Sequence, residues 1–193
     1  MNRKQSILSA TVGTITLVTA FTLMGGGAAS ASPPRSTPPN PSTTSCWVDV
    51  STQQSLCVAA GDDLIAAVQD EDGVTLVVPA GTSVGGLTVS AARSAAALLV
   101  PASTQTATVV SAIYDDINYG GGTLLLTGAS CNSYVSNLAT YGWNDRASSF
   151  KSFAGCDTAL WQNINFGGTH VGYTTNDPSF GSFNDQASSW HTE

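Results

Sequence analysis

The second half of the chain repeats itself, and this duplication limits the possible folds more than any other feature. The segment YDDINYGG, which begins at Tyr114, recurs 47 residues later as WQNINFGG. The segment WNDRASSF, which begins at Trp143, recurs 40 residues later as FNDQASSW. Both matches keep the same order, and the loop between them is seven residues shorter in the second copy. The two copies are therefore expected to fold alike.

Each copy has the pattern of short β-strands. A strand that ends in aromatic residues leads to a Gly-Gly turn, an apolar strand (124–126 or 170–173), a variable loop and an Asn-Asp stretch. Four short strands per copy predict two Greek keys, at about 112–154 and 159–193, that face each other as a sandwich. The two rings of each first segment are expected to pack together, while Gly121 and Gly168 adopt backbone angles that are closed to other residues.

The composition excludes several classes of protein. Charged residues make up only 10% of the 193 residues, against about 25% in an ordinary soluble domain. This low content disfavours a disordered acidic chain, a coiled coil or a charge-rich helical bundle. With six Lys and Arg residues and a net charge of −7, the chain also lacks the basic patch that nucleic-acid binding requires.

The repeated Asn-Asp stretch carries the chemistry that the sequence offers. Carboxylate, amide and hydroxyl oxygens recur at matched positions, namely Asn144, Asp145 and Ser148 in the first copy and Asn184, Asp185 and Ser188 in the second. Ca²⁺ takes six to eight oxygen ligands and needs no His or Cys. The alternative is a simple turn in which these side chains bond to nearby backbone. Because the stretch occurs twice, each time after a candidate Greek key, calcium binding is the better explanation.

These motifs resemble the βγ-crystallin superfamily, in particular its microbial calcium-binding members. The likeness covers about Ser111 to Glu193. It rests on an aromatic pair followed by Gly (Tyr114-x4-Tyr119-x-Gly121 and Trp161-x4-Phe166-x-Gly168) and on the clamp Asn/Asp-Asn/Asp-x-x-Ser/Thr-Ser, which both 144–149 and 184–189 match in full. The resemblance implies a mainly β double Greek-key domain with two calcium sites, each built from both clamps.

The resemblance also implies a set of ligands. Asp145 and Asp185 would supply side-chain oxygens, and Ser148 and Ser188 hydroxyl oxygens. Water and main-chain carbonyl groups would complete the two ligand shells. The carbonyl groups are those of Arg146, Gln186, Asp115 and Gln162. One carboxylate per clamp predicts modest affinity, on the order of 10⁻⁴ to 10⁻³ M or about tenfold tighter. Arg146 departs from the pattern and is expected to weaken its site unless its side chain points to solvent.

Two other functions compete with calcium binding. The same fold occurs in a secreted actinobacterial inhibitor of metalloproteinases, so an extracellular protease is the alternative partner, although no reactive loop is apparent here. An enzyme is disfavoured, because His170 and His191 accompany no nucleophile motif such as Gly-x-Ser-x-Gly. The four tryptophans are compatible with sugar stacking. Three of them, however, occupy repeat positions, where burial in the hydrophobic core is a sufficient reason for a large aromatic residue.

The region 45–110 is expected to form a small β-rich subdomain with one or two helices. Residues 46–50 alternate like a strand, and 56–58 return as its partner. Asp62 or Asp63 is expected to cap a helix over 64–68 that ends at Gly73, followed by a strand over 74–78. The alanine-rich stretch 91–99 favours a second helix. No catalytic constellation occurs in this region.

The four cysteines predict two disulfide bonds, since an even number in an exported chain is typical of a disulfide framework. Of the three possible pairings we favour Cys46 with Cys57, which encloses a hairpin, and Cys131 with Cys156, which lies within the C-terminal half. A zinc site is the poorer alternative, because no Cys-x-x-Cys occurs and the histidines lack ligand spacing.

The first 44 residues predict export. Arg3 and Lys4 precede an uncharged apolar stretch, 7–24, and Ala29-Ser30-Ala31 supplies a cleavage pattern. Residues 1–31 are therefore interpreted as a secretory signal peptide, in preference to a membrane anchor. Residues 32–44, rich in Pro, Ser and Thr, are expected to be an extended linker. The mature protein is expected to be a secreted, extracellular monomer that binds calcium ions.

Overall fold

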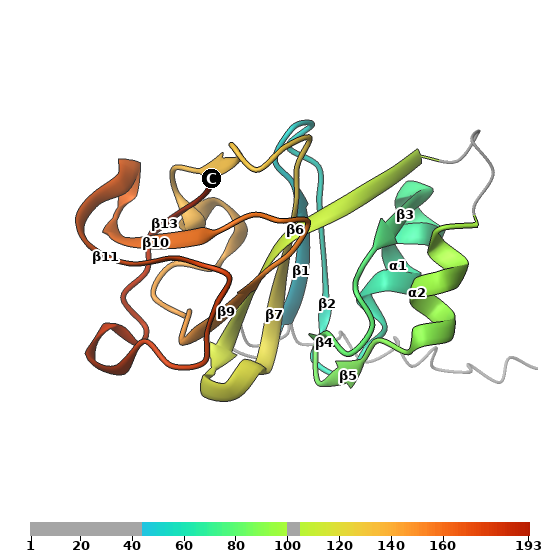
Figure 1. Cartoon of the computed structure of the whole chain (residues 1–193), viewed down its shortest axis with the longest axis horizontal. Helices are drawn as coiled ribbons and strands as arrows, with labels where there is room; N and C mark the ends of the chain where they lie inside the picture. The colour runs from blue at the N-terminus through green and yellow to red at the C-terminus, as the bar shows by residue number, and fades with distance from the viewer. Residues whose placement is uncertain (1–43, 100–104) are drawn as a thin grey trace, which may run out of the picture. The chain divides into compact units, whose positions relative to one another are not determined.

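The computed structural model describes residues 44–99 and 105–193, all within the unit Thr37–Glu193 (Figure 1). The expected signal peptide and all but the last residue of the expected linker lie outside the described residues. Within these two ranges, no helix is long and apolar enough to cross a membrane.

The repeated half forms the expected pairs of Greek-key strands, with four strands from each copy. The first copy contributes β6 (Gln105–Asp116), β7 (Gly120–Thr127), β8 (Tyr134–Val135) and β9 (Ser149–Ser152). The second contributes β10 (Thr158–Asn163), β11 (Gly167–Thr174), β12 (Asn176–Asp177) and β13 (Ser189–Thr192). Short 3-10 helices lie between these strands, η2 (Ile117–Tyr119), η3 (Leu138–Tyr141), η4 (Ile164–Phe166) and η5 (Gly181–Phe183).

Each copy gives its third strand to the sheet of the other copy. One sheet contains β12, β9, β6 and β7 in neighbouring positions, so β12 of the second copy pairs with β9 of the first. The other sheet has the order β11-β10-β13-β8, so β8 of the first copy pairs with β13 of the second. Because of this exchange, neither copy completes its sheet alone.

The core between the two sheets consists of the large side chains that alternate inward along these strands. Trp143, Phe150 and Trp190 are fully buried there, together with Ile113 and Leu160. Trp143 and Trp190 are thus core residues, as expected, whereas the third repeat-position tryptophan, Trp161, is only partly buried. Burial of such large rings supplies most of the hydrophobic stabilisation of the sandwich.

The N-terminal region contains the elements expected from its pattern. Its strands are β1 (Thr44–Asp49), β2 (Ser55–Ala59), β3 (Val74–Val77), β4 (Ser83–Val84) and β5 (Leu87–Thr88), and its helices are α1 (Leu64–Asp72) and α2 (Ala91–Ala97). The Asp63 side chain caps α1 by accepting a hydrogen bond from the Ala66 amide, and Gly73 ends it with a φ of 67°.

Both favoured disulfide bonds are present. Cys46 and Cys57 face each other in the antiparallel pair β1–β2. Cys131 and Cys156 join the loop after β7 to the loop before β10. Within the described residues no cysteine is free.

The N-terminal region shares a sheet with the first Greek key. β1 pairs in parallel with β7, and β3 pairs in parallel with the first residues of β6. β6 itself runs from Gln105 to Asp116, across residue 110, where the sequence placed the end of the subdomain. The first Greek key is therefore extended by strands from the N-terminal region.

A second core lies between this region and the outer face of the first Greek key (Figure 1). Successive residues of β6 point to opposite faces, so Tyr114 enters the second core while Ile113 enters the first. Leu125 of β7 and Trp47 of β1 are fully buried beside Tyr114, and Leu64 of α1 covers them. The Trp47 indole N–H donates to the Thr127 hydroxyl at 3.1 Å.

Replacement of Trp47 by Ala should destabilise the protein strongly, because it empties the centre of the second core. We expect the free energy of unfolding to fall by about 3–5 kcal/mol, measured by urea denaturation followed by circular dichroism. Leu99, which is 83% exposed, is the control, and Leu99→Ala should change the value by less than about 0.5 kcal/mol. A loss below about 1 kcal/mol for Trp47→Ala would contradict this account of the second core.

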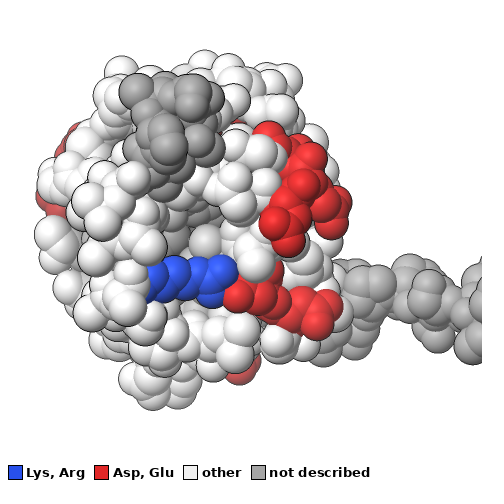
Figure 2. Space-filling view, turned by 90° about the vertical axis from the view of Figure 1, so that its right-hand side faces the viewer, with Lys and Arg blue, Asp and Glu red and all other residues white. Residues whose placement is uncertain are grey.

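A second prediction concerns pH and the ion pair between the cap of α1 and α2. Figure 2 shows the side of the molecule on which these helices lie, where a basic side chain touches an acidic one. Asp63 accepts from Arg93 at 2.6 Å. Burial, the largest influence, raises the pKa of Asp63, but hydrogen bonds from Arg93 and the Ala66 amide, together with the Arg93 charge, hold it below its ordinary value. The ionised group therefore stabilises the fold above the unfolded pKa of about 4, and this stabilisation is lost as pH falls through the lowered folded pKa.

Asp63→Asn retains one oxygen to cap α1, and it removes the charge and the second oxygen, which accepts from Arg93. We expect the native chain to be more stable than this variant near pH 7, and the difference to shrink as pH is lowered through about 4. Asp62→Asn removes the same charge from an exposed neighbour and serves as the control. Thermal melts across pH measure both differences, and a difference that grew on acidification would contradict the stabilising role of the ionised Asp63.

Candidate functional site

The two clamps, 144–149 and 184–189, lie against each other through a reciprocal pair of main-chain hydrogen bonds. The Asp145 amide donates to the Ala187 carbonyl at 3.0 Å, and the Asp185 amide donates to the Ala147 carbonyl at 3.0 Å. Both aspartates adopt left-handed backbone angles, with φ of 55° and 56°. Asp tolerates this conformation better than most residues, so the matched carboxylates occupy equivalent positions in the two turns.

Oxygen atoms from opposite clamps meet in one half of this arrangement. The Ser148 hydroxyl donates to Asp185 Oδ1 at 3.2 Å, although 37 residues separate the two in the sequence. In the other half, Asp145 Oδ2 accepts from its neighbour Asn144 Nδ2 at 2.6 Å. Ser148 and Ser188 are both buried, at 4% and 7% exposure. The structure therefore brings Ser148 of one clamp to Asp185 of the other, whereas no hydrogen bond within the described residues joins the equivalent pair, Asp145 and Ser188.

Asn184 contributes an unusual oxygen to the second clamp. Its side-chain Oδ1 is buried and has no hydrogen-bond partner within the residues that the structure describes. A buried polar atom without a partner costs free energy, on the order of 1–3 kcal/mol. An oxygen of this kind has a free lone pair for a cation.

Each clamp is also attached to the hairpin of its own copy. The Ser148 amide donates to the Tyr114 carbonyl at 2.9 Å, and the Ser188 amide donates to the Trp161 carbonyl at 2.8 Å. These bonds bring each clamp beside the residue that follows the aromatic, Asp115 in the first copy and Gln162 in the second. The expected carbonyl ligands thus belong to segments directly bonded to the clamps.

The last serine of each clamp locks the folded hairpin. Ser149 Oγ donates to the Asp116 carbonyl at 2.6 Å and accepts from the Tyr119 amide at 3.1 Å. Ser189 makes the equivalent bonds to the Asn163 carbonyl at 2.7 Å and the Phe166 amide at 3.1 Å. Sequence reasoning assigned no role to these two serines, although their recurrence in both copies was visible.

The locked hairpins contain the expected ring pairs and glycine conformations. Tyr114 and Tyr119 have ring centroids 5.6 Å apart, and Trp161 and Phe166 are 5.4 Å apart, both edge to face. Gly121 and Gly168 have φ of 74° and 78°, in the left-handed region. A Cβ at Gly121 would lie 2.9 Å from the Asp115 Cβ, so these positions also leave no room for a side chain.

The two halves of the site differ at Arg146. Its guanidinium binds Asp115 in a bidentate ion pair, with Nε to Oδ1 at 2.9 Å and Nη2 to Oδ2 at 2.8 Å. It also lies 4.0 Å from the centroid of the Trp143 ring, and its side chain is only 10% exposed, so it does not point to solvent. In the second half an uncharged amide pair replaces this contact, with Gln162 donating to Gln186 at 3.1 Å.

The Asp115 carboxylate is therefore already engaged. Burial raises the pKa of Asp115 above its ordinary value, and the hydrogen bond and charge of Arg146 only partly oppose that effect. The ion pair neutralises the charge that Arg146 brings into the clamp. Any contribution of Asp115 to a cation site would therefore come from its main-chain carbonyl.

The donors at the clamps are mainly neutral oxygens. Over residues 44–99 and 105–193, no group of three or more His, Cys, Asp and Glu side chains lies together in a way that could hold a metal ion. The clamps supply one carboxylate each, with amide and hydroxyl side chains beside it. This donor set suits a hard cation that accepts neutral oxygens and water.

Two Greek keys that exchange strands and meet through paired clamps define a double Greek-key domain. A solved double mutant of a βγ-crystallin domain from Clostridium beijerinckii is 32% identical to this chain, over 43% of this chain and 94% of that one, with a TM-score of 0.38. The chain is therefore similar to solved βγ-crystallin domains, and its duplicated clamp and exchanged strands fit a double Greek key of the kind that its motifs predict.

Other solved βγ-crystallin domains are also similar. One from Flavobacterium johnsoniae is 29% identical over 44% of this chain and 93% of its own length, with a TM-score of 0.36. One from Ciona intestinalis is 26% identical over 43% and 98%, with a TM-score of 0.37. No protein-family model and no curated protein sequence matches the chain.

The hydrogen bonds that Ser149 and Ser189 make to the two hairpins lead to a direct prediction. Ser149→Ala and Ser189→Ala each leave a carbonyl and an amide without their partner, so each should lower the free energy of unfolding by about 1–3 kcal/mol. Ser182, whose exposed side chain makes no hydrogen bond within the described residues, gives the matched control Ser182→Ala. Urea denaturation measures all three variants. Equal stability of the two lock variants and the control would contradict the role assigned to these serines.

Proposed function

We propose that this is a secreted, non-enzymatic βγ-crystallin protein whose paired clamps bind calcium, which stabilises the double Greek key. One observation carries the proposal: Ser148 Oγ and Asp185 Oδ1, from opposite clamps, lie 3.2 Å apart. A cation beside this pair would bind both copies at once. Such an ion would stabilise the native arrangement, because the unfolded chain does not hold the two clamps together.

The Asn184 oxygen supports the same proposal. Its Oδ1 is buried without a partner in the described part of the chain, and a bound cation would remove the resulting cost. The proposed ligands are main-chain oxygens of Arg146, Gln186, Asp115 and Gln162, together with side chains of the two clamps, namely Asn144, Asp145, Ser148, Asn184, Asp185 and Ser188. Water would complete each shell of six to eight oxygens.

The proposed affinity is modest. Each clamp supplies one carboxylate, which favours dissociation constants on the order of 10⁻⁴ to 10⁻³ M, the range of extracellular modules, or about tenfold tighter. At a calcium concentration 100 times the dissociation constant, each site would add about 2.7 kcal/mol to the free energy of unfolding. Calcium would therefore act as a stabiliser where it is plentiful.

Secretion is supported by the two disulfide bonds, which form and persist in oxidising compartments. The absence of a catalytic role is supported by the contacts of His191. Its Nδ1 lies 2.9 Å from the Tyr173 hydroxyl and its Nε2 lies 3.1 Å from Asn132 Oδ1. Both ring nitrogens are thus engaged, and neither faces a serine or cysteine nucleophile.

Calcium titration tests the proposal. Isothermal titration of the native chain should give heats of binding, and saturating calcium should raise the melting temperature by about 5–10 °C per occupied site. Asp145→Ala combined with Asp185→Ala should abolish both effects. Asp62→Ala combined with Asp72→Ala removes the same charge from exposed positions and should leave both unchanged.

Two results would contradict the proposal. One is a native chain that gives no heat with millimolar calcium and melts at the same temperature with calcium as with a chelator. The other is a calcium response that survives in the Asp145 and Asp185 double variant.

A further inference from the structure

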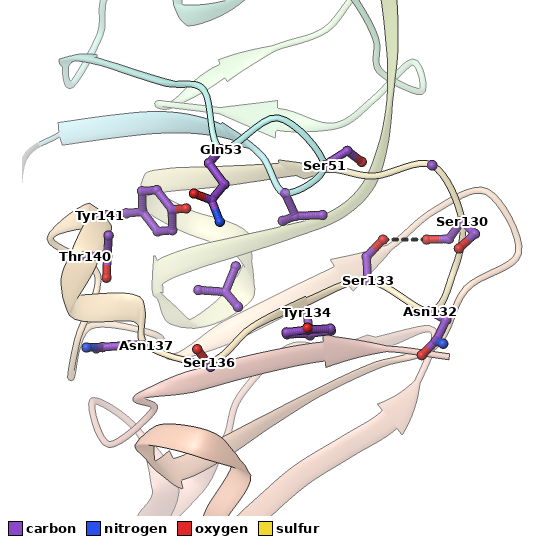
Figure 3. A pocket seen from close by; sticks show the side chains of 13 residues that line it. Ser51, Gln53, Ser130, Asn132, Ser133, Tyr134, Ser136, Asn137, Thr140 and Tyr141 are labelled. Carbon is purple, nitrogen blue, oxygen red and sulfur yellow. Dashed lines mark hydrogen bonds between the residues drawn. The ribbon is translucent and has the colours of Figure 1, made fainter.

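A groove of about 420 Å³, whose lining contains no clamp residue, lies between the β1–β2 turn and the segment that runs from β8 into η3 (Figure 3). Its volume falls within the range of small-molecule sites, about 300–1,000 Å³. The side chains that project into it come from three separate segments, 50–53, 129–137 and 140–141. We propose that this groove binds a neutral oligosaccharide, with Tyr134 as a stacking platform.

The groove is uncharged. All of its lining side chains are neutral, and most carry a hydroxyl or an amide group. The chain as a whole has a net charge of −7, which disfavours an anionic ligand. A ligand that matches this surface offers many neutral hydroxyl groups and little charge, which is the chemistry of a neutral sugar.

Several polar groups of the groove are available for such a ligand. The side chains of Gln53, Ser136 and Thr140 make no hydrogen bond to other residues in the described ranges. Each can both donate and accept, as sugar hydroxyls also do. They come from opposite sides of the groove, as Figure 3 shows for Gln53 and Ser136.

Tyr134 supplies an apolar face. Its side chain is 60% exposed, and Figure 3 shows the ring edge-on, so that one face of it borders the groove. The edge-to-face contact with Phe166, at 5.8 Å between centroids, holds the ring from the other copy. The carbon-bound hydrogens on one face of a pyranose ring form an apolar surface that packs well on such a flat aromatic ring.

The walls of the groove are already ordered. On one side, Asp49 Oδ1 accepts from the Ser51 and Thr52 amides at 2.8 and 3.1 Å, which fixes the β1–β2 turn. On the other side, the Cys131–Cys156 disulfide anchors the loop before β8, and Ser133 Oγ donates to the Ser130 carbonyl at 2.7 Å. A preformed site loses less conformational entropy on binding than a flexible one does.

Titration of the full chain with cellohexaose, chitohexaose and laminarihexaose tests the proposal, because these are neutral glycans of different linkage and substitution. At least one should bind, and the one that binds identifies the preferred sugar. Tyr134→Ala should weaken that binding at least about tenfold, whereas Tyr134→Phe, which keeps the ring face, should stay within about threefold. Leu87→Ala, at a 45% exposed apolar position outside the groove, is the matched control.

Failure of all three glycans to bind at millimolar concentration would overturn the proposal. Equal binding by Tyr134→Ala and the native chain would overturn the assignment to this groove. An equal loss in Tyr134→Phe and Tyr134→Ala would overturn the stacking role. Each titration is run with calcium and with a chelator, and circular dichroism confirms that each variant is folded. Glycan binding that persists in the chelator and is lost in Tyr134→Ala belongs to the groove, independently of the calcium proposal.

Discussion

The structure depends on the reciprocal hydrogen bonds between the two clamps. The Asp145 amide reaches the Ala187 carbonyl, and the Asp185 amide reaches the Ala147 carbonyl. Each copy therefore satisfies a main-chain group of the other where Ala147 and Ala187 are fully buried and an unmet group would be costly. The exchange of β8 and β12 between the sheets extends this dependence to the edges. The same contact determines where the oxygen donors meet. The interaction that holds the two copies together therefore also forms the candidate site.

The two copies share a backbone pattern but differ in their surroundings. In the first copy, the outer face of the sheet lies in the second core, where Tyr114 and Leu125 are fully buried. In the second copy the equivalent ring, Trp161, is only partly buried, and most of β11 is exposed. The charged Arg146–Asp115 pair also belongs to the covered copy, whereas Gln162 and Gln186 meet in the open one. Because the N-terminal region covers only the first copy, the two similar sequences present different surfaces to solvent.

Local patterns in the sequence were sufficient to predict much of this fold. The duplicated motifs predicted the Greek keys, the ring pairs and the left-handed glycines, and a capping residue at Asp62 or Asp63 with Gly73 predicted α1. The cysteine spacing favoured both disulfide bonds. The parallel pairings of β1 with β7 and of β3 with β6 were not predicted. The alternation of apolar and polar residues along a strand does not specify the distant strand with which it pairs. The ion pair of Arg146 and the groove beside Tyr134 likewise arise from contacts between segments remote in sequence.

The parallel pairing of β1 with β7 has a consequence for how the chain folds. Trp47 and Thr127, which are bonded across this pair, are 80 residues apart. The ends of a segment this long must meet before the pairing contributes, and contacts of this range slow folding. During synthesis the N-terminal strands emerge well before β7 exists, so β1 remains an unpaired edge for that interval on its β7 side. Completion of the native sheet must therefore wait until the first Greek key has been synthesised.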